Sequence, residues 1–211
     1  NQLIRPGMKA RFSSLICGLA FVGTGAVADV LNPTIGNLLY EEQFNSLNSS
    51  AWNVIEGDGC AIGLCGWGNQ ELEYYRANNV TIENVPFEPA TRALAIEARR
   101  EAFGGRGFTS GKLDTANKVQ VQYGMIELRI STPRVGVGLW PAAWMLGTSL
   151  ASWPSKGELD IMEMGHRALG RAEAGYGGAD INSFVGSNAI FYSPSACVPE
   201  NLTCAASTAW Q

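Results

Sequence analysis

The stretch Gly157-Glu158-Leu159-Asp160-Ile161-Met162-Glu163 places three carboxylates within six residues of an otherwise apolar, strand-like run. Acidic side chains in a half-buried strand are costly to desolvate, so a cluster of three calls for a chemical reason. Because side chains alternate along a regular strand, Glu158 and Asp160 share one face and Glu163 points to the other. One extra residue in a β-bulge, most simply at Ile161 or Met162, brings Glu163 round to the side of Glu158.

Two glutamates on one face of a strand suit the hydrolysis of a glycosidic bond. Along the bulged strand the two backbone positions are separated by roughly 13 Å. Two long side chains that lean together can approach the roughly 5–5.5 Å between the carboxyl groups of a retaining glycosidase. Asp160 lies between them and can hydrogen-bond one of the two carboxyl groups. From the spacing alone, an acidic edge of an exposed strand is an equal alternative.

Tryptophans lie close to these carboxylates in the sequence, in WPAAWMLG (residues 140–147) and at Trp153. Indole faces stack on the apolar C–H faces of sugar rings, so such residues suit a sugar cleft. Together, WPAAWMLG and GELDIME resemble glycoside hydrolase family 16, and the two residues between Asp160 and Glu163 are typical of its bulged, laminarinase form. Further family-like segments occur in the family's order, so the resemblance covers roughly residues 38–165; they are GWGNQELEYY (66–75), TSGK (109–112) and YGMIELR (123–129).

The resemblance implies a role for each acidic residue of this stretch. Glu158 is expected to be the nucleophile, Glu163 the acid/base and Asp160 an assisting carboxylate. Trp140 and Trp144 are expected to be stacking surfaces near the cleaved bond. For either tryptophan a place in the core is the alternative.

The other substrate-binding candidates are polar residues. Asn69 and Glu71 match a family segment that lines the glycone side, although Glu71 could equally be a structural ion-pair partner. Arg129 could bind sugar hydroxyls or neutralise a nearby acid. His166 follows the catalytic strand closely, and we expect it to line the cleft; a lone histidine is more often structural.

Short alternating or apolar runs separated by glycine, asparagine and proline dominate the chain, and no window shows a helical stripe with caps. We therefore predict an all-β protein, with strands at residues 38–44, 80–85, 93–98, 119–131 and 136–146. The family resemblance implies a jelly-roll β-sandwich of two antiparallel sheets with a concave substrate cleft. Because family members usually continue well past this point, we expect residues 29–211 to be a partial catalytic domain, incomplete at the C-terminus.

Residues 1–28 are expected to be upstream sequence plus a secretory signal peptide. Lys9 and Arg11 precede a short apolar stretch, and Ala26-Val27-Ala28 forms a small-residue cleavage site. The apolar stretch is shorter than the ~20 residues that span a bilayer. We therefore expect a secreted or periplasmic protein without membrane association after cleavage. The chain has a formal net charge of −4 and no basic run in its predicted mature part, so no nucleic-acid partner is expected.

Four cysteines follow the predicted signal: Cys60, Cys65, Cys197 and Cys204. In an exported protein an even number indicates disulfides, with three possible connectivities, and the close spacings favour Cys60–Cys65 and Cys197–Cys204. A zinc site is the alternative, but only His166 could join as a nitrogen ligand and the spacing does not fit a zinc finger. No metal site and no required cofactor are predicted, although family members often hold a structural calcium that this sequence cannot place.

These observations predict a monomeric, retaining endo-glycosidase that hydrolyses laminarin-type β-1,3-glucan by double displacement. Within enzymes, the alternative is a family relative that acts on mixed-linkage glucan or a galactan. A non-catalytic β-glucan-binding protein on the same fold is the alternative from another class. Such proteins typically lack the catalytic glutamates, and this chain keeps Glu158 and Glu163.

Overall fold

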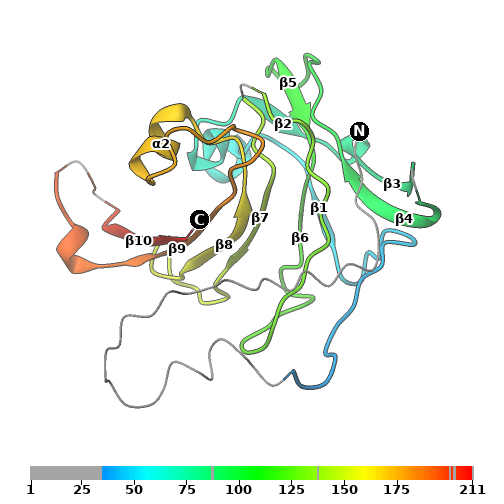
Figure 1. Ribbon diagram of the computed structural model, residues 1–211, viewed down its shortest axis with the longest axis horizontal. Helices are drawn as coiled ribbons and strands as arrows, with labels where there is room; N and C mark the ends of the chain where they lie inside the picture. The colour runs from blue at the N-terminus through cyan, green and yellow to red at the C-terminus, as the bar shows by residue number, and fades with distance from the viewer. Residues whose placement is uncertain (1–34, 87, 137, 200, 202, 211) are drawn as a thin grey trace. The chain divides into compact units, whose positions relative to one another are not determined.

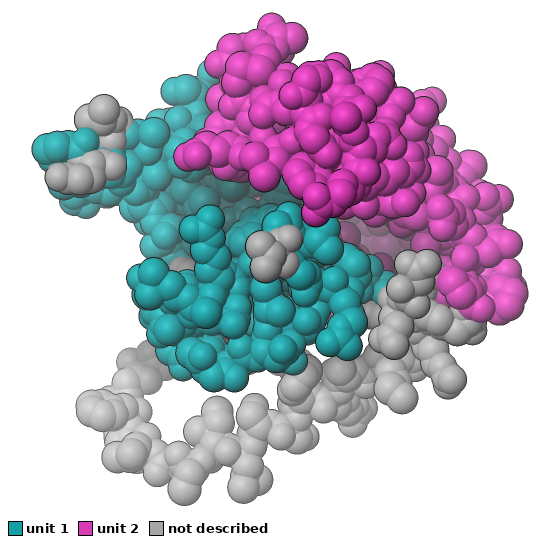
Figure 2. Space-filling model, turned by 90° about the horizontal axis from the view of Figure 1, so that it is seen from above, with its two compact units in different colours: residues 1–2, 131–211 teal, residues 3–130 magenta. Residues whose placement is uncertain are grey.

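The computed structural model describes residues 35–210, except residues 87, 137, 200 and 202. The predicted signal peptide and the predicted start at Asp29 lie outside the described residues. The chain divides into two compact units, coloured teal and magenta in Figure 2. Unit 1 is described over residues 131–210 and unit 2 over residues 35–130.

Unit 1 is built on a four-stranded antiparallel sheet with the strand order β10-β9-β8-β7 (Figure 1). Its strands are β7 (Ala142–Leu146), β8 (Glu158–Glu163), β9 (Gly186–Tyr192) and β10 (Ala205–Trp210). The short helix α2 (Ala168–Glu173) lies between β8 and β9 in the chain, and the 3₁₀ turn η4 (Pro194–Ala196) lies between β9 and β10. Strand β8 is paired on both sides, which fixes the register and therefore the direction of its acidic side chains.

Unit 2 contains three two-stranded sheets. Strands β1 (Asn53–Ile55) and β6 (Lys112–Asp114) are antiparallel, β2 (Glu73–Tyr75) and β5 (Phe108–Ser110) are parallel, and β3 (Val80–Val85) and β4 (Glu88–Ile96) form an antiparallel hairpin. Three 3₁₀ turns complete its described secondary structure: η1 (Cys60–Ile62), η2 (Cys65–Gly68) and η3 (Ala77–Asn79).

The predicted all-β class is confirmed, but two of the predicted strands are wrong. Residues 80–85 form β3 as expected, whereas residues 38–44 and 119–131 form no strand. Leu39 is 79% exposed and Tyr123 is 81% exposed, so the apolar pattern there covers no core. A strand needs a neighbour for its backbone N–H and C=O groups, and alternation of side chains does not supply one.

Within the described residues, one sheet has four strands and three sheets have two strands each. None of the helices in the described part of the chain has the length and apolar character that crossing a bilayer requires.

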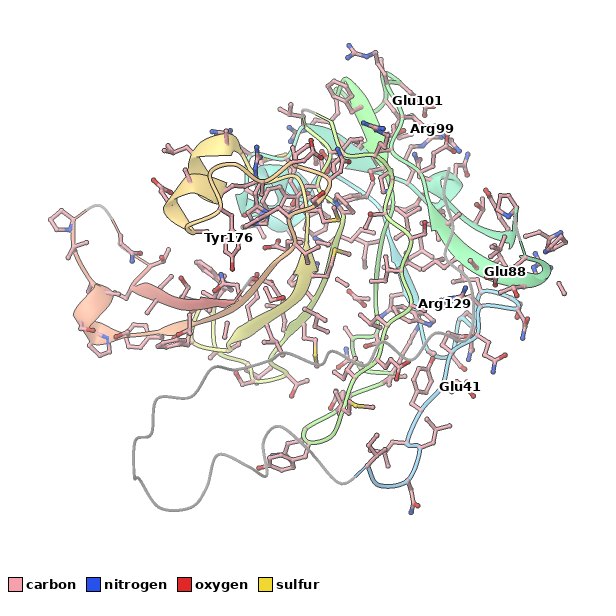
Figure 3. All side chains as sticks on the ribbon, viewed as in Figure 1. Glu41, Glu88, Arg99, Glu101, Arg129 and Tyr176 are labelled. Atoms are coloured by element: carbon pink, nitrogen blue, oxygen red, sulfur yellow. A yellow bond between two sulfur atoms is a disulfide. The ribbon has the colours of Figure 1, made fainter. Side chains whose placement is uncertain are left out.

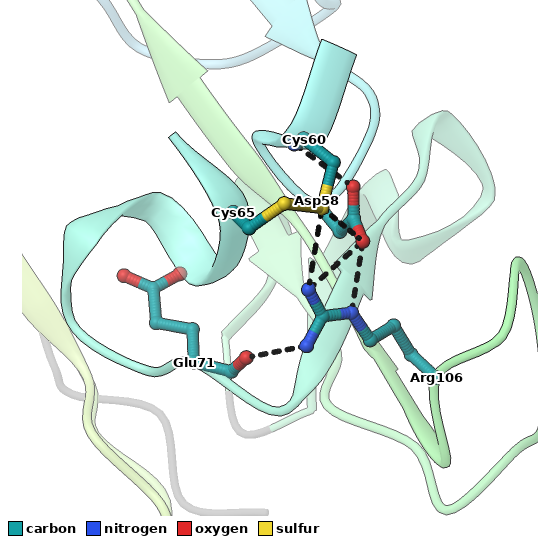
Figure 4. Close-up of a disulfide and its surroundings, with 5 residues drawn as sticks. All are labelled: Asp58, Cys60, Cys65, Glu71 and Arg106. Atoms are coloured by element: carbon teal, nitrogen blue, oxygen red, sulfur yellow. Dashed lines mark hydrogen bonds and ion pairs between the residues drawn. A yellow bond between two sulfur atoms is a disulfide. The ribbon is translucent and has the colours of Figure 1, made fainter. Parts of the chain in front are cut away.

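Both predicted disulfides are confirmed, and one of them is braced by an arginine. Cys60–Cys65 joins η1 to η2, and Cys197–Cys204 closes the connection from β9 to β10. Arg106 Nε donates to Asp58 Oδ2 at 2.9 Å, and the backbone N–H of Cys60 donates to Asp58 Oδ1 at 3.1 Å (Figure 4). The Cys60 N–H, and then Arg106, lower the pKa of Asp58, so this carboxylate is a fixed anchor for the loop.

Candidate active site

Strand β8 carries one residue more than its neighbour β7. Ala143 pairs with Met162 and the next residue, Trp144, pairs with Asp160, so Ile161 has no partner on β7. This is the geometry of a β-bulge, in which two residues of one strand oppose one residue of the other.

The pairing with β9 places the bulge in the same segment. Asp160 and Glu163 are three residues apart, yet their partners on β9 are only two residues apart. The carbonyl group of Ile161 accepts a hydrogen bond from Ser187 Oγ at 2.8 Å, which satisfies a backbone group that the bulge removes from the ladder. The predicted bulge is confirmed.

The bulge places all three carboxylates on one face of the sheet. Their partners on β7 are alternate residues, which share a face; they are Leu146 opposite Glu158, Trp144 opposite Asp160 and Ala142 opposite Glu163. Directly paired residues of antiparallel strands also share a face. The carboxylate face of β8, meaning the face that carries Glu158, Asp160 and Glu163, is therefore shared by Trp144.

Asp160 is the enclosed member of the three, with only 3% of its surface exposed. Burial raises the pKa of Asp160 to about 7, and the charges of Glu163 and Glu158 and a hydrogen bond with Glu158 act in the same direction. A carboxyl group with this pKa is largely protonated below neutral pH and can donate its proton to Glu158. This chemistry fits an assisting carboxylate between two partly exposed glutamates.

Each glutamate accepts a hydrogen bond from a tryptophan indole. Trp140 Nε1 donates to Glu163 Oε1 at 2.8 Å, and Trp153 Nε1 donates to Glu158 Oε2 at 2.7 Å. Both tryptophans remain open to solvent, at 50% and 42% exposure. The indoles therefore orient the two carboxylates without enclosing them. Sequence reasoning did not select Trp153 as a site residue, although its place between the two motifs was a usable signal.

Trp144 and His166 also belong to this part of unit 1. Trp144 lies on the carboxylate face and is partly exposed, which favours a stacking surface over a place in the core. The ring of His166 lies 4.6 Å from that of Trp140. Burial lowers the pKa of His166, Arg171 acts in the same direction and Glu163 opposes both, so the imidazole is neutral at neutral pH.

A family model described as "XgeA-like, catalytic GH16 domain" matches residues 76–174, which contain β7 and β8 with all three carboxylates. The laminarinase catalytic domain of Thermotoga petrophila RKU-1 has a solved structure that superimposes with a TM-score of 0.60 at 31% identity, covering 83% of this chain and 62% of that one. Residues 76–174 of this chain belong to glycoside hydrolase family 16.

Two curated relatives are also similar to this chain. The beta-glucanase of Rhodothermus marinus is 45% identical over 106 residues, which are 48% of this chain and 35% of that protein. The clotting factor G alpha subunit of Tachypleus tridentatus is 34% identical over 151 residues, which are 71% of this chain and 20% of that protein. The chain thus spans about a fifth to a third of the length of these two relatives.

Two of the polar candidates from the family-16 pattern lie together in unit 2. Asn69 Nδ2 donates to Glu71 Oε1 at 3.3 Å, and Tyr75 Oη donates to Glu71 Oε2 at 2.6 Å. Burial raises the pKa of Tyr75, and Glu71 adds to the effect, so the phenol stays protonated and keeps donating. Lys112 Nζ lies 4.3 Å from the centre of the Trp67 ring beside this group.

Arg129, the third candidate in unit 2, forms an ion pair with Glu88. Its Nη2 donates to Glu88 Oε1 at 2.8 Å, and both residues are labelled in Figure 3. A guanidinium held in this way favours the expectation that Arg129 neutralises an acid over the expectation that it binds sugar.

The described residues offer no metal site of the usual kind. Among them, no group of three or more His, Cys, Asp or Glu side chains could hold a metal ion. The family resemblance suggests a structural calcium ion, but the described residues contain no such group of side chains to bind it.

Proposed function

We propose that this protein is a secreted or periplasmic, monomeric endo-glycosidase that hydrolyses laminarin-type β-1,3-glucan with retention of configuration. The bulge in β8 carries the proposal, because it turns Glu158, Asp160 and Glu163 to one face. The similarity to proteins named beta-glucanase and laminarinase supports the substrate class. Two disulfides support an oxidising compartment.

The proposed reaction is a double displacement. A carboxylate oxygen of Glu158 attacks the anomeric carbon while the bond from that carbon to the leaving oxygen breaks, and protonated Glu163 gives its proton to that oxygen. In the second step Glu163, now a carboxylate, takes a proton from water as the water attacks the same carbon and releases Glu158. Asp160 can supply a hydrogen bond to Glu158 during both steps.

Glutamine variants test the two assigned roles. Glu158→Gln removes nearly all turnover but leaves glucan binding, because the nucleophile is lost and the indoles are not. Glu163→Gln lowers kcat/KM for laminarin far more than for an aryl β-glucoside with a good leaving group, which needs little protonation. Glu173→Gln on α2 is a matched control and leaves both substrates unaffected. Equal losses on both substrates in Glu163→Gln contradict the acid/base assignment.

Retention and substrate class need separate measurements. Proton NMR of the first-formed product shows the β-anomer if the mechanism is retaining, and an initial α-anomer rules it out. Release of reducing ends from laminarin, lichenan and agarose separates β-1,3-glucan from mixed-linkage glucan and galactan. The same assay tests the alternative of a β-glucan-binding protein without catalysis. Binding to laminarin without any release of reducing ends favours that alternative.

A further inference from the structure

His166 is packed between aromatic rings and has no polar partner for one of its nitrogens. Its ring centre lies 4.6 Å from that of Trp140 and 5.0 Å from that of Phe184, which packs edge-on against it. The Nδ1 atom is buried and has no hydrogen-bond partner among the described residues. The Nδ1 nitrogen is therefore closed off from a sugar hydroxyl.

Two neighbours fix the position of His166: Gly186 leaves space for its ring, and Arg171 holds its backbone. A Cβ atom on Gly186 would lie 2.7 Å from His166 Cε1 and 2.9 Å from Nε2, so the ring occupies the space that any side chain at Gly186 would fill. Gly186 is the β9 partner of Glu163, so the ring stands on the carboxylate face. Arg171 of α2 donates from Nη1 to the backbone carbonyl group of His166 and from Nε to that of Ala179.

The ring that His166 supports is the one that donates to the proposed acid/base. Trp140 is half exposed, and its Nε1 donates a hydrogen bond to Glu163 at 2.8 Å. An exposed indole can rotate away from a carboxylate unless a neighbour limits it. We infer that His166 is a positioning residue, whose ring fills the space over Gly186 and holds the Trp140 indole against Glu163. This inference rests on the function proposed above.

Substitutions at His166 separate packing from polar recognition. His166→Phe keeps a flat ring without nitrogen, so it retains kcat/KM on laminarin within about twofold. His166→Ala removes the ring that supports Trp140, so kcat/KM on laminarin falls about tenfold while KM stays the same. A loss of about tenfold corresponds to the lower end of the energy range of a hydrogen bond to a charged group. The same variant retains most of its kcat/KM on an aryl β-glucoside with a good leaving group, because the lost contact serves Glu163. If His166 has only a structural role, kcat/KM falls equally on laminarin and on the aryl β-glucoside, and this result overturns the inference.

A double-mutant cycle tests whether the effect passes through Trp140. Trp140→Phe alone gives the loss expected for His166→Ala, and adding His166→Ala in that background changes kcat/KM by less than about twofold. Additive losses contradict the inference, as does a raised KM in His166→Phe. Phe191→Ala is the control, because Phe191 is an exposed aromatic residue of β9 on the face of the sheet opposite the carboxylate face.

One measurement does not depend on turnover. The Trp140 indole N–H signal in a ¹⁵N NMR spectrum, assigned with Trp140→Phe, moves in His166→Ala and stays in place in His166→Phe. If His166→Ala does not fold, Gly186→Ala displaces the ring from the other side and carries the same expectations. A wild-type protein that cleaves no glucan refutes the proposed function alone, whereas an unmoved indole signal refutes the positioning role alone.

Discussion

Replacing Asp160 with asparagine is expected to stabilise the protein above neutral pH. Asp160 is 3% exposed, and burial together with Glu163 and Glu158 raises its pKa to about 7, whereas an aspartate in an unfolded chain has a pKa of about 3.9. Below pH 4 both states hold the proton and the residue has no effect on the pH dependence. Between pH 4 and pH 7 only the folded state keeps the proton, so the free energy of unfolding falls as pH rises.

The size of the effect follows from the shift in pKa. About three pKa units at about 1.4 kcal/mol each correspond to up to about 4 kcal/mol of stability lost above pH 7. Asparagine has the same shape, carries no charge and can still donate a hydrogen bond to Glu158. The variant should therefore match the wild type near pH 4 and exceed it by up to about 4 kcal/mol at pH 8.

Urea unfolding followed by tryptophan fluorescence at pH 4, 5.5 and 8 measures this difference. Asp180→Asn is a control with the opposite sign, because the backbone N–H of Asn182 lowers the pKa of exposed Asp180. That variant loses stability at pH 8 and matches the wild type only at low pH. A difference between Asp160→Asn and the wild type that does not change with pH, or that is negative at pH 8, refutes the reasoning.

Three further outcomes are expected. Trp153→Phe removes the indole N–H that Glu158 accepts at 2.7 Å, so steady-state kinetics should show kcat on laminarin reduced about tenfold. Gly165→Ala places a Cβ atom 2.2 Å from the carbonyl oxygen of Leu139 at a φ of +106°, so thermal unfolding should show a loss of more than about 1 kcal/mol. Asn79, within an Asn-Val-Thr glycosylation pattern, is 1% exposed and its amide donates two hydrogen bonds, so peptide mass analysis after secretion from a eukaryotic host should find it unmodified.

The parts of the site that the sequence could predict depend on local geometry. Two residues separate Asp160 from Glu163, and in a strand of period two only an extra, bulged residue can return Glu163 to the side of Glu158. The structure contains that bulge. The pairing of Cys60 with Cys65 can likewise be predicted without knowing the fold, because the two residues are close in the chain, and they pair as expected.

The parts that the sequence could not predict depend on which segments meet. Residues 119–131 alternate as a strand should, yet no described strand pairs with them, and alternation cannot say whether a neighbour is present. The indole of Trp153 contacts Glu158 from the loop between β7 and β8, whose course a propensity argument does not determine. The nearness of His166 to β8 is visible in the sequence, while the rings of Trp140 and Phe184 that flank it are not.

Three carboxylates on one face of a strand repel one another and are costly to desolvate. In the structure this cost is reduced because the three carboxylates have different environments. Glu158 and Glu163 are partly exposed, and each accepts a hydrogen bond from an indole N–H. Asp160 is enclosed, and it holds its proton to about pH 7. Below neutral pH Asp160 therefore adds no full negative charge to this face. It is this enclosure of the middle residue, rather than the acidic motif itself, that keeps Asp160 protonated and lowers the charge repulsion that Glu158 and Glu163 experience from it.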